Sequence, residues 1–492
     1  MARRRTEPQL QALLKEFRKL PQETEWLEFK QNKEKPEEIG EYISAMANSA
    51  ALADKQCGFV IWGVADDSHA VVGTKFDPAA TKKGNEELTS WLRRLTSPDV
   101  DFVFHRLTVD GKRVVVMEVP RATRHPVRFQ NDEFIRLGSY TKKLRDFPEK
   151  ERELWRILGT MPFEQLTALG DIGEDDVLRL LDYPAYFNLL HIPLPSAKQG
   201  IIDALNVDGM IAPSETGMWN VTNLGAALFA QRLSEFPGLE RKAMRVVVYR
   251  GNNKVETIKE QVGAKGYANG FEGLISFING LLPSNEALGQ ALRRTIPMFP
   301  EMAVRELVAN ALIHQDFFIS GAGPLVEIYG DRIEISNPGK PLTDPERFLD
   351  MPPRSRNEKL ASLMRRLGIC EERGSGVDKV VAQLELFQLP PALFEVRGDN
   401  TIAVLFAQRA LSKMDRSERV RACYQHACLR YVMREHMTNK SLRERFGIED
   451  RNSAQASRLI KEAVADGRIV PVDEKAAPKM MKYLPFWARP GT

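Results

Sequence analysis

The hydrophobic and polar positions of this chain change their spacing several times, which indicates several domains. Residues 6–20 place leucines and a phenylalanine at helical spacing, with Lys and Arg between them, and predict a short amphipathic helix. Short apolar runs then alternate with helical patterns, and one hairpin turns at Asp110-Gly111. We therefore expect an N-terminal helix over 1–20 and a compact mixed α/β domain over 21–150.

Three further blocks follow. Residues 151–295 have a mainly helical pattern, and within them a helix, a turn at Asp208-Gly209 and a strand suit a small winged-helix insert. Over 296–407 the α/β pattern returns, with two strands split by Gly330-Asp331, a long loop, a helix and two closing strands. The final block, 408–492, is helical with a terminal hairpin. The expected fold class is thus multidomain α/β and α+β.

The final block has the element order of a winged helix-turn-helix. Helices are expected over 438–446 and 452–466, with a turn at Gly447-Ile448, and two short strands follow at the spacing of a wing. Such a fold places its second helix in a DNA major groove, where basic side chains neutralise phosphate. The predicted nucleic-acid-binding residues are Arg451, Gln455, Arg458 and Lys461.

Charge supports this prediction because it is unevenly distributed. The chain of 492 residues has a net charge of +4, while residues 408–492 hold 18 Lys and Arg against 10 Asp and Glu, a net charge of +8. A basic domain of this kind favours a nucleic-acid partner. A helical protein-interaction domain with a solvated basic face is the alternative.

Composition narrows the class of protein. Four scattered cysteines are too few for a disulfide framework and lack the paired spacing of a structural zinc site. No apolar run is long enough to span a membrane, and the first residues do not read as a signal peptide. We therefore expect a cytoplasmic protein without a membrane partner.

The helix expected at the start of the 296–407 block carries polar residues on one face. Glu306, Asn310 and His314 are four residues apart, while the other side of the helix is apolar. A carboxylate and an amide one turn apart can polarise a water molecule and bind Mg²⁺. Two glycine turns follow, one ending a strand and one opening a helix whose amides can receive phosphate, at 337–339 and 374–376.

In this order and spacing, the three segments resemble the N, G1 and G2 boxes of the GHKL ATPase superfamily, in its RecG-related regulator subgroup. The resemblance implies a GHKL-type α/β sandwich that binds ATP and Mg²⁺. It makes Glu306 the general base, Asn310 the Mg²⁺ ligand and Gly339 the adenine-side turn. It also makes Gly374 and Gly376 the phosphate loop.

The chain departs from that superfamily at Asn337, where members usually carry Asp. An Asn oxygen still accepts a hydrogen bond from the adenine amino group, but the negative charge is absent. In the long loop, Arg354, Arg356 and Lys359 are candidates for a lid. The phosphate loop of helicase motors, Gly-x-x-x-x-Gly-Lys-Ser/Thr, does not occur, so we do not expect a helicase.

Acidic residues also gather near the start of the chain. The segments around Glu23 and Glu28, around Asp66 and around Tyr140 resemble the Schlafen/AlbA-type domain over about residues 20–140, a domain associated with nucleic-acid binding. In nuclease-active Schlafen relatives, two Glu five apart and a later Asp bind a divalent metal. The resemblance therefore implies Glu23, Glu28 and Asp66 as ligands of Mg²⁺ or Mn²⁺.

Such a metal activates water and stabilises charge on a phosphodiester, and Lys30 adds positive charge at the same phosphate. Glu25 is an alternative to Glu23 as the first of the three metal ligands. Without a metal, three carboxylates repel phosphate, so binding of nucleic acid without cleavage stays an alternative.

Two functions remain open. The first is an ATP-responsive enzyme whose front domain binds and cleaves RNA or DNA, compatible with bacterial stress response or phage defence. The second is a transcriptional regulator that binds nucleic acid without cleaving it and senses a nucleotide. Because GHKL domains often dimerise, we expect a homo-oligomer, a dimer or larger.

Overall fold

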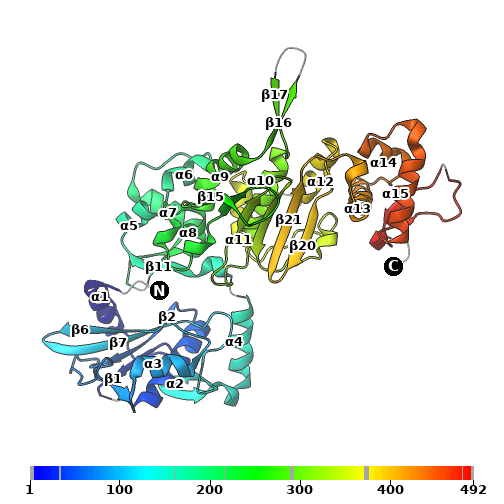
Figure 1. The fold of residues 1–492 in the computed structure, drawn as a ribbon. Coiled ribbons are helices and arrows are strands. Elements are labelled where there is room, and N and C mark those ends of the chain that lie inside the picture. The colour runs from blue at the N-terminus through cyan, green and yellow to red at the C-terminus, as the bar shows by residue number, and fades with distance from the viewer. Residues whose placement is uncertain are drawn as a thin grey trace. The chain divides into compact units, whose positions relative to one another are not determined.

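The computed structural model describes residues 5–32, 35–160, 162–214, 216–288, 293–370, 376–478 and 480–488 (Figure 1). These residues form two compact units, Met1–Leu178 with Lys198–Gly225 and Arg179–Ala197 with Ala226–Thr492. Among the described residues, no helix combines the length and the apolar composition that crossing a membrane requires.

A four-stranded sheet in the order β1-β2-β7-β6 is the centre of the first unit. β1 (Leu27–Lys30) runs parallel to β2 (Cys57–Trp62), and β7 (Lys112–Pro120) and β6 (Val103–Val109) follow antiparallel. Between β6 and β7, Asp110 and Gly111 have φ angles of 51° and 70°. Two positive φ angles are the mark of the tight type I′ turn, so the hairpin predicted there is confirmed.

The helix α2 (Pro36–Leu52) packs against β2 and against β9 (Asp132–Leu137). It begins with a proline and has two glutamates in its first turn, where both residue types favour a helix start. Near its end, the fully buried Asn48 donates from Nδ2 to the carbonyls of Val127 (2.8 Å) and Phe134 (2.9 Å) and accepts from the Val127 N–H (2.7 Å). This one side chain therefore joins the helix to the second sheet of the unit.

That second sheet has the order β10-β9-β8-β5, and a three-stranded sheet with the order β11-β13-β12 lies further along the chain. The other helices and strands from the beginning of the chain to residue 229 are α1 (Glu7–Phe17), β3 (Lys82–Lys83), β4 (Glu86–Glu87), α3 (Leu88–Leu95), β5 (Thr96–Ser97), β8 (Arg128–Phe129), β10 (Tyr140–Lys143), α4 (Pro148–Thr160), β11 (Thr167–Ile172), α5 (Glu174–Leu180), α6 (Tyr183–Leu189), α7 (Lys198–Val207), β12 (Ile211–Pro213), β13 (Trp219–Thr222) and α8 (Asn223–Phe229).

The second unit contains a six-stranded sheet in the order β15-β14-β18-β19-β21-β20. Its strands are β14 (Arg245–Tyr249), β15 (Thr257–Val262), β18 (Leu325–Ile328), β19 (Arg332–Pro338), β20 (Leu393–Arg397) and β21 (Asn400–Phe406). β14 is parallel to β18, and the other neighbouring pairs are antiparallel. β18 and β19 are separated by residues 329–331, which include Gly330 and Asp331, so the two strands predicted there are confirmed.

The strands β14 and β15 differ from the mainly helical pattern that the sequence predicted for this region. Val246 and Val247 are buried, whereas every residue of β15 is exposed, as expected for the edge strand of a sheet. β14 pairs with β15 on one side and, on the other, runs parallel to β18, about 80 residues further along the chain. A partner so distant in sequence leaves no local periodicity to detect.

Helices cover one side of this sheet. α10 (Glu301–His314) packs against β19, with α9 (Tyr267–Leu281) and α12 (Gly376–Leu386) as neighbours. α11 (Glu358–Arg366) interrupts what the sequence predicted as one long loop, so Lys359 lies on a helix. Figure 1 also shows β16 (Ser284–Leu288) and β17 (Arg293–Pro297) as a hairpin projecting from this unit.

The C-terminal elements lie in the predicted order. α13 (Arg416–Val432) is followed by α14 (Asn439–Phe446), α15 (Ser453–Ala465) and the antiparallel strands β22 (Ile469–Pro471) and β23 (Tyr483–Pro485). Gly447 ends α14 with a left-handed φ of 62°. The three helices share a core with β22. We refer to residues 416–488 as the C-terminal domain.

We expect Asn48→Ala to lower the free energy of unfolding of the first unit by about 2–4 kcal/mol, because the buried Val127 N–H loses its acceptor. Urea titration followed by tryptophan fluorescence measures this, since five of the six tryptophans lie in that unit. Asn85→Ala is the control: Asn85 is exposed, and the expected change is below about 0.5 kcal/mol. Equal changes in the two variants would contradict the role given to Asn48.

Candidate functional sites

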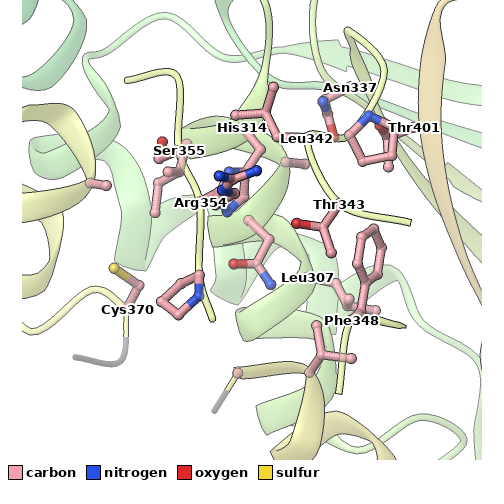
Figure 2. A pocket seen from close by; sticks show the side chains of 18 of the residues that line it. Leu307, His314, Asn337, Leu342, Thr343, Phe348, Arg354, Ser355, Cys370 and Thr401 are labelled. Atoms are coloured by element: carbon pink, nitrogen blue, oxygen red, sulfur yellow. The ribbon is translucent and has the colours of Figure 1, made fainter. Parts of the chain in front are cut away.

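A cavity of about 660 Å³ lies in the second unit, between α10, the end of β19, the loop 341–356 and the start of α12 (Figure 2). This volume is in the range of cavities that bind small organic molecules and cofactors. Figure 2 shows Asn337 and Thr401 next to each other on one side, and Arg354 with His314 on another.

The predicted polar face of α10 forms part of this cavity. Glu306, Asn310 and His314 all line it. Glu306 is 7% exposed, and burial together with the nearby Arg356 lowers the pKa of His314 to about 4. His314 is therefore neutral near pH 7 and offers a hydrogen bond rather than a positive charge.

Gly376 opens α12 directly beside that face. A Cβ atom placed on Gly376 would lie 2.8 Å from Oε2 of Glu306 and 3.7 Å from Nδ2 of Asn310. A side chain at this position would therefore require the Glu306 carboxylate to move, whereas glycine lets it stay where it is. The amide-rich end of α12 thus meets a carboxylate and an amide, while Gly374 lies outside the described residues.

The opposite wall of the cavity ends at Asn337 and Gly339. Gly339 has φ +104°, its N–H donates to the carbonyl of Asp399 (2.7 Å), and its carbonyl accepts from Oγ1 of Thr401 (2.7 Å). Asn337 is 6% exposed, and its Nδ2 donates to the carbonyl of Pro338 (3.1 Å). The predicted glycine turn therefore lies at the cavity and holds a polar side chain against it.

Two neighbouring polar residues also shape the cavity: Arg356, one of the predicted lid candidates, and Asn357, which the prediction did not include. Arg356 pairs with Asp316 (3.3 Å) and donates to the carbonyl of Lys340. The buried Asn357 donates to the carbonyls of Ile313 (2.7 Å) and Gln315 (2.9 Å), which ties the loop to the end of α10. The sequence gives no signal for Asn357, because its partners lie more than 40 residues away.

These residues fit a nucleoside triphosphate with Mg²⁺. Glu306 and Asn310 offer the hard oxygen atoms that Mg²⁺ prefers, and the glycine-opened helix offers amides to phosphate. Arg354 and Arg365 add positive charge at the cavity wall. Apolar surface for a base comes from residues that include Ile335, Leu342, Phe348 and Phe394.

The acidic residues of the first unit form a different kind of cluster. Glu28 is 1% exposed, and its two carboxylate oxygens contact Lys30 Nζ and Arg136 Nη2. Glu23 accepts from the Phe29 N–H (2.7 Å) and lies 3.7 Å from Arg136. The structure therefore brings Glu23, Glu28 and Lys30 together around a buried arginine on β9 that the sequence did not single out.

Asp66 lies at the edge of this cluster, with a 58% exposed side chain 3.9 Å from Lys30. In the described part of the chain, no three His, Cys, Asp or Glu side chains are grouped so that they could hold a metal ion. Both oxygens of Glu28 face cations, so the arrangement does not fit Mg²⁺ or Mn²⁺ at Glu23, Glu28 and Asp66. A metal there would have to displace Lys30 and Arg136.

Burial changes the pKa of Glu23, a member of this cluster. Desolvation raises the pKa of Glu23 to about 7, the nearby Glu28 raises it further, and the hydrogen bond from the Phe29 N–H opposes the shift. Near neutral pH this carboxyl group therefore exchanges a proton with solvent, unlike an ordinary surface glutamate.

The basic residues predicted in the C-terminal domain lie on and before α15. This helix packs inward through Ala456, Leu459, Ile460 and Ala463. Arg458 and Lys461 are exposed, Gln455 is half-buried, and Arg451 is exposed and paired with Glu449.

Two family models match separate parts of the chain. Residues 23–145 match the model described as "Schlafen, AlbA_2", and residues 321–406 match the one described as "Putative ATP-dependent DNA helicase recG C-terminal". The two predicted resemblances, a Schlafen/AlbA-type domain and a RecG-related ATPase-like domain, are confirmed at this level. The first match contains the acidic cluster, and the second contains Asn337 and Gly339.

Among solved structures, the chain is similar to the crystal structure of the DIP2311 protein from Corynebacterium diphtheriae. The identity is 18%, the match covers 97% of this chain and 96% of that chain, and the TM-score is 0.41. No match is found among curated proteins.

The raised pKa of Glu23 predicts a pH-dependent stability. Because the folded-state pKa of about 7 exceeds the ordinary value of 4.5, its contribution is complete below pH 4.5 and is lost as the pH rises through 7. Compared with Glu23→Gln, the wild type should lose about 1–3 kcal/mol of unfolding free energy between pH 4.5 and 8. Urea titrations of both proteins across this range measure it, and a constant difference would contradict the shift.

Proposed function

We propose that this protein is a nucleotide-responsive regulator that binds nucleic acid without cleaving it. The observation that carries the proposal is the cavity in which Glu306, Asn310 and the glycine-opened helix α12 converge. The two family matches support an ATP-dependent protein related to nucleic acid. The compensated charges around Glu28 favour this reading over the nuclease.

At the cavity, the residues divide into three roles. Asn310 would hold Mg²⁺, which when bound screens the negative charge of the phosphates. Glu306 would accept a proton from the attacking water, and the α12 amides and Arg354 would hold the phosphates. The turn at Asn337 and Gly339 would position the base.

In the C-terminal domain, the exposed face of α15 would contact nucleic acid. Arg458 and Lys461 are one turn apart on that face, and Arg451 precedes the helix. The AlbA-type domain would provide a second contact. A homo-oligomer and a place in bacterial stress response or phage defence stay predictions.

For the nucleotide site, we expect Glu306→Gln to bind ATP within about threefold of the wild type and to hydrolyse it at least about 100-fold more slowly. Gly376→Ala should also slow hydrolysis, because its methyl group displaces the Glu306 carboxylate. Calorimetry measures binding, and phosphate release measures turnover. The control is Gly273→Ala on α9, where a Cβ atom meets nothing within 4 Å.

If the wild type binds ATP but Glu306→Gln has the same turnover, Glu306 is not the base. If Gly376→Ala leaves turnover unchanged, the close approach to Glu306 has no functional role.

For nucleic acid, we expect the double variant Arg458→Ala/Lys461→Ala to bind a 25-base-pair DNA duplex more weakly. The slope of log K against log salt should fall by about 2, since each lost phosphate contact removes about 0.9. Fluorescence anisotropy at several salt concentrations measures it. The control, Arg250→Ala/Lys259→Ala, makes the same charge change on the exposed β14–β15 hairpin.

The same DNA, and single- and double-stranded RNA, should remain intact with Mg²⁺ or Mn²⁺, with and without ATP. Metal-dependent products that disappear in Glu28→Ala/Asp66→Ala would replace this proposal with the nuclease. An unchanged salt slope in the double variant would remove α15 from the binding surface.

A further inference from the structure

The helix α12 extends from the nucleotide cavity to the C-terminal domain. Gly376 and Val377, at its start, line the cavity. On the same helix, Val381 belongs to a buried apolar cluster with Tyr424, Cys428 and Leu429 of α13. With 11 residues, the helix spans about 16 Å. A single rigid element therefore contacts both the cavity and the C-terminal domain.

The far end of α12 is fixed by a buried polar group. Oε2 of Glu385 lies 2.9 Å from Nδ1 of His426 on α13, and Oε1 lies 3.6 Å from Nε of Arg445 on α14. Nε2 of His426 lies 3.0 Å from Oγ of Ser441, and Arg445 donates to the carbonyl of Leu389 (2.6 Å). One carboxylate of the nucleotide domain thus holds two helices of the C-terminal domain.

A second connection runs through the loop 341–356. Phe348 and Met351 of this loop line the cavity, and Leu349 belongs to the same apolar cluster as Val381. On the outer side of the loop, Glu346 pairs with Arg468, which precedes β22.

The backbone of this loop is also held. The carbonyl of Glu346 accepts from the Tyr424 hydroxyl, which in turn accepts from Trp487 Nε1 (3.0 Å). The Arg347 guanidinium lies 4.5 Å from the centre of the Trp487 indole ring. Two walls of the cavity, the loop and the helix α12, are therefore bound to the C-terminal domain.

We propose that these two connections, at Glu385 and at Glu346, couple occupation of the cavity to the affinity of the C-terminal domain for DNA. This inference rests on the proposed function, because it needs both ligands to bind. A ligand that moves the loop or α12 necessarily changes the contacts of Glu346 or Glu385. By thermodynamic linkage, DNA must then change the nucleotide affinity by the same factor.

The experiment titrates the full chain with the 25-base-pair duplex, with and without a saturating non-hydrolysable ATP analogue and Mg²⁺, and titrates the analogue with and without duplex. In the wild type, we expect each ligand to change the dissociation constant of the other by the same factor, at least about fivefold. In Glu346→Gln/Glu385→Gln, each ligand should still bind alone, but the factor should fall to below about twofold.

Glu435→Gln is the matched control, because Glu435 pairs with Arg430 (2.6 Å) inside the C-terminal domain and contacts no residue of the nucleotide domain through that pair. It should keep the wild-type factor. Glu346→Gln alone guards against misfolding of the double variant, since the Glu346 side chain is 42% exposed, and it should give an intermediate factor.

Two results would overturn the coupling while leaving the proposed function intact: a wild-type factor of one with both ligands bound, or an undiminished factor in the double variant. A wild type that fails to bind the analogue or the duplex would instead overturn the proposed function, and the coupling with it.

Discussion

The approach of Gly376 to Glu306 is the constraint on which the second unit depends. A methyl group at this position would lie 2.8 Å from Oε2 of Glu306, so the carboxylate would have to move to make room for it. The first turn of α12 lies beside Asn310 at the phosphate end of the cavity, and the same helix carries Glu385 to the C-terminal domain.

The carboxylates Glu28 and Glu306 differ in the charges around them, and this difference indicates which of them can take part in ligand binding. Glu28 is buried between two cations, an arrangement in which removing one partner leaves an uncompensated charge and is strongly destabilising. Each oxygen of Glu28 already faces a cation, so a metal ion would have to compete with Lys30 and Arg136 for it. Glu306 instead lines a cavity of about 660 Å³ beside Asn310 and the start of α12, a volume that can hold a ligand.

What could be predicted from the sequence was mostly local. The face shared by Glu306, Asn310 and His314 follows from helical periodicity, and the Asp110-Gly111 hairpin follows from turn chemistry. Both are present in the structure because nearby residues determine them.

What the sequence did not reveal depends on partners that are distant in the chain. Arg136 lies 108 residues after Glu28, and no spacing rule connects a cation on β9 with a carboxylate on β1. The pairing of β14 with β18 and the hydrogen bonds of Asn357 likewise join residues that are far apart in the sequence. The resemblance to metal-binding relatives pointed to Glu23, Glu28 and Asp66, but it gave no sign of Arg136, the cation that faces Glu28.

The two connections to the C-terminal domain, at Glu385 and at Glu346, differ in how far their ion pairs are exposed to solvent. The side chains of His426 and Arg445 are 1% and 2% exposed, so separating them from Glu385 would remove the carboxylate that faces His426 Nδ1 and the buried Arg445 charge. Glu346 and Arg468 are each about 40% exposed, and a pair of that kind contributes about 0–1 kcal/mol, so it exchanges readily with water. The outer pair therefore costs less free energy to break than the contacts of Glu385, so of the two connections it is the one that a ligand in the cavity would change first.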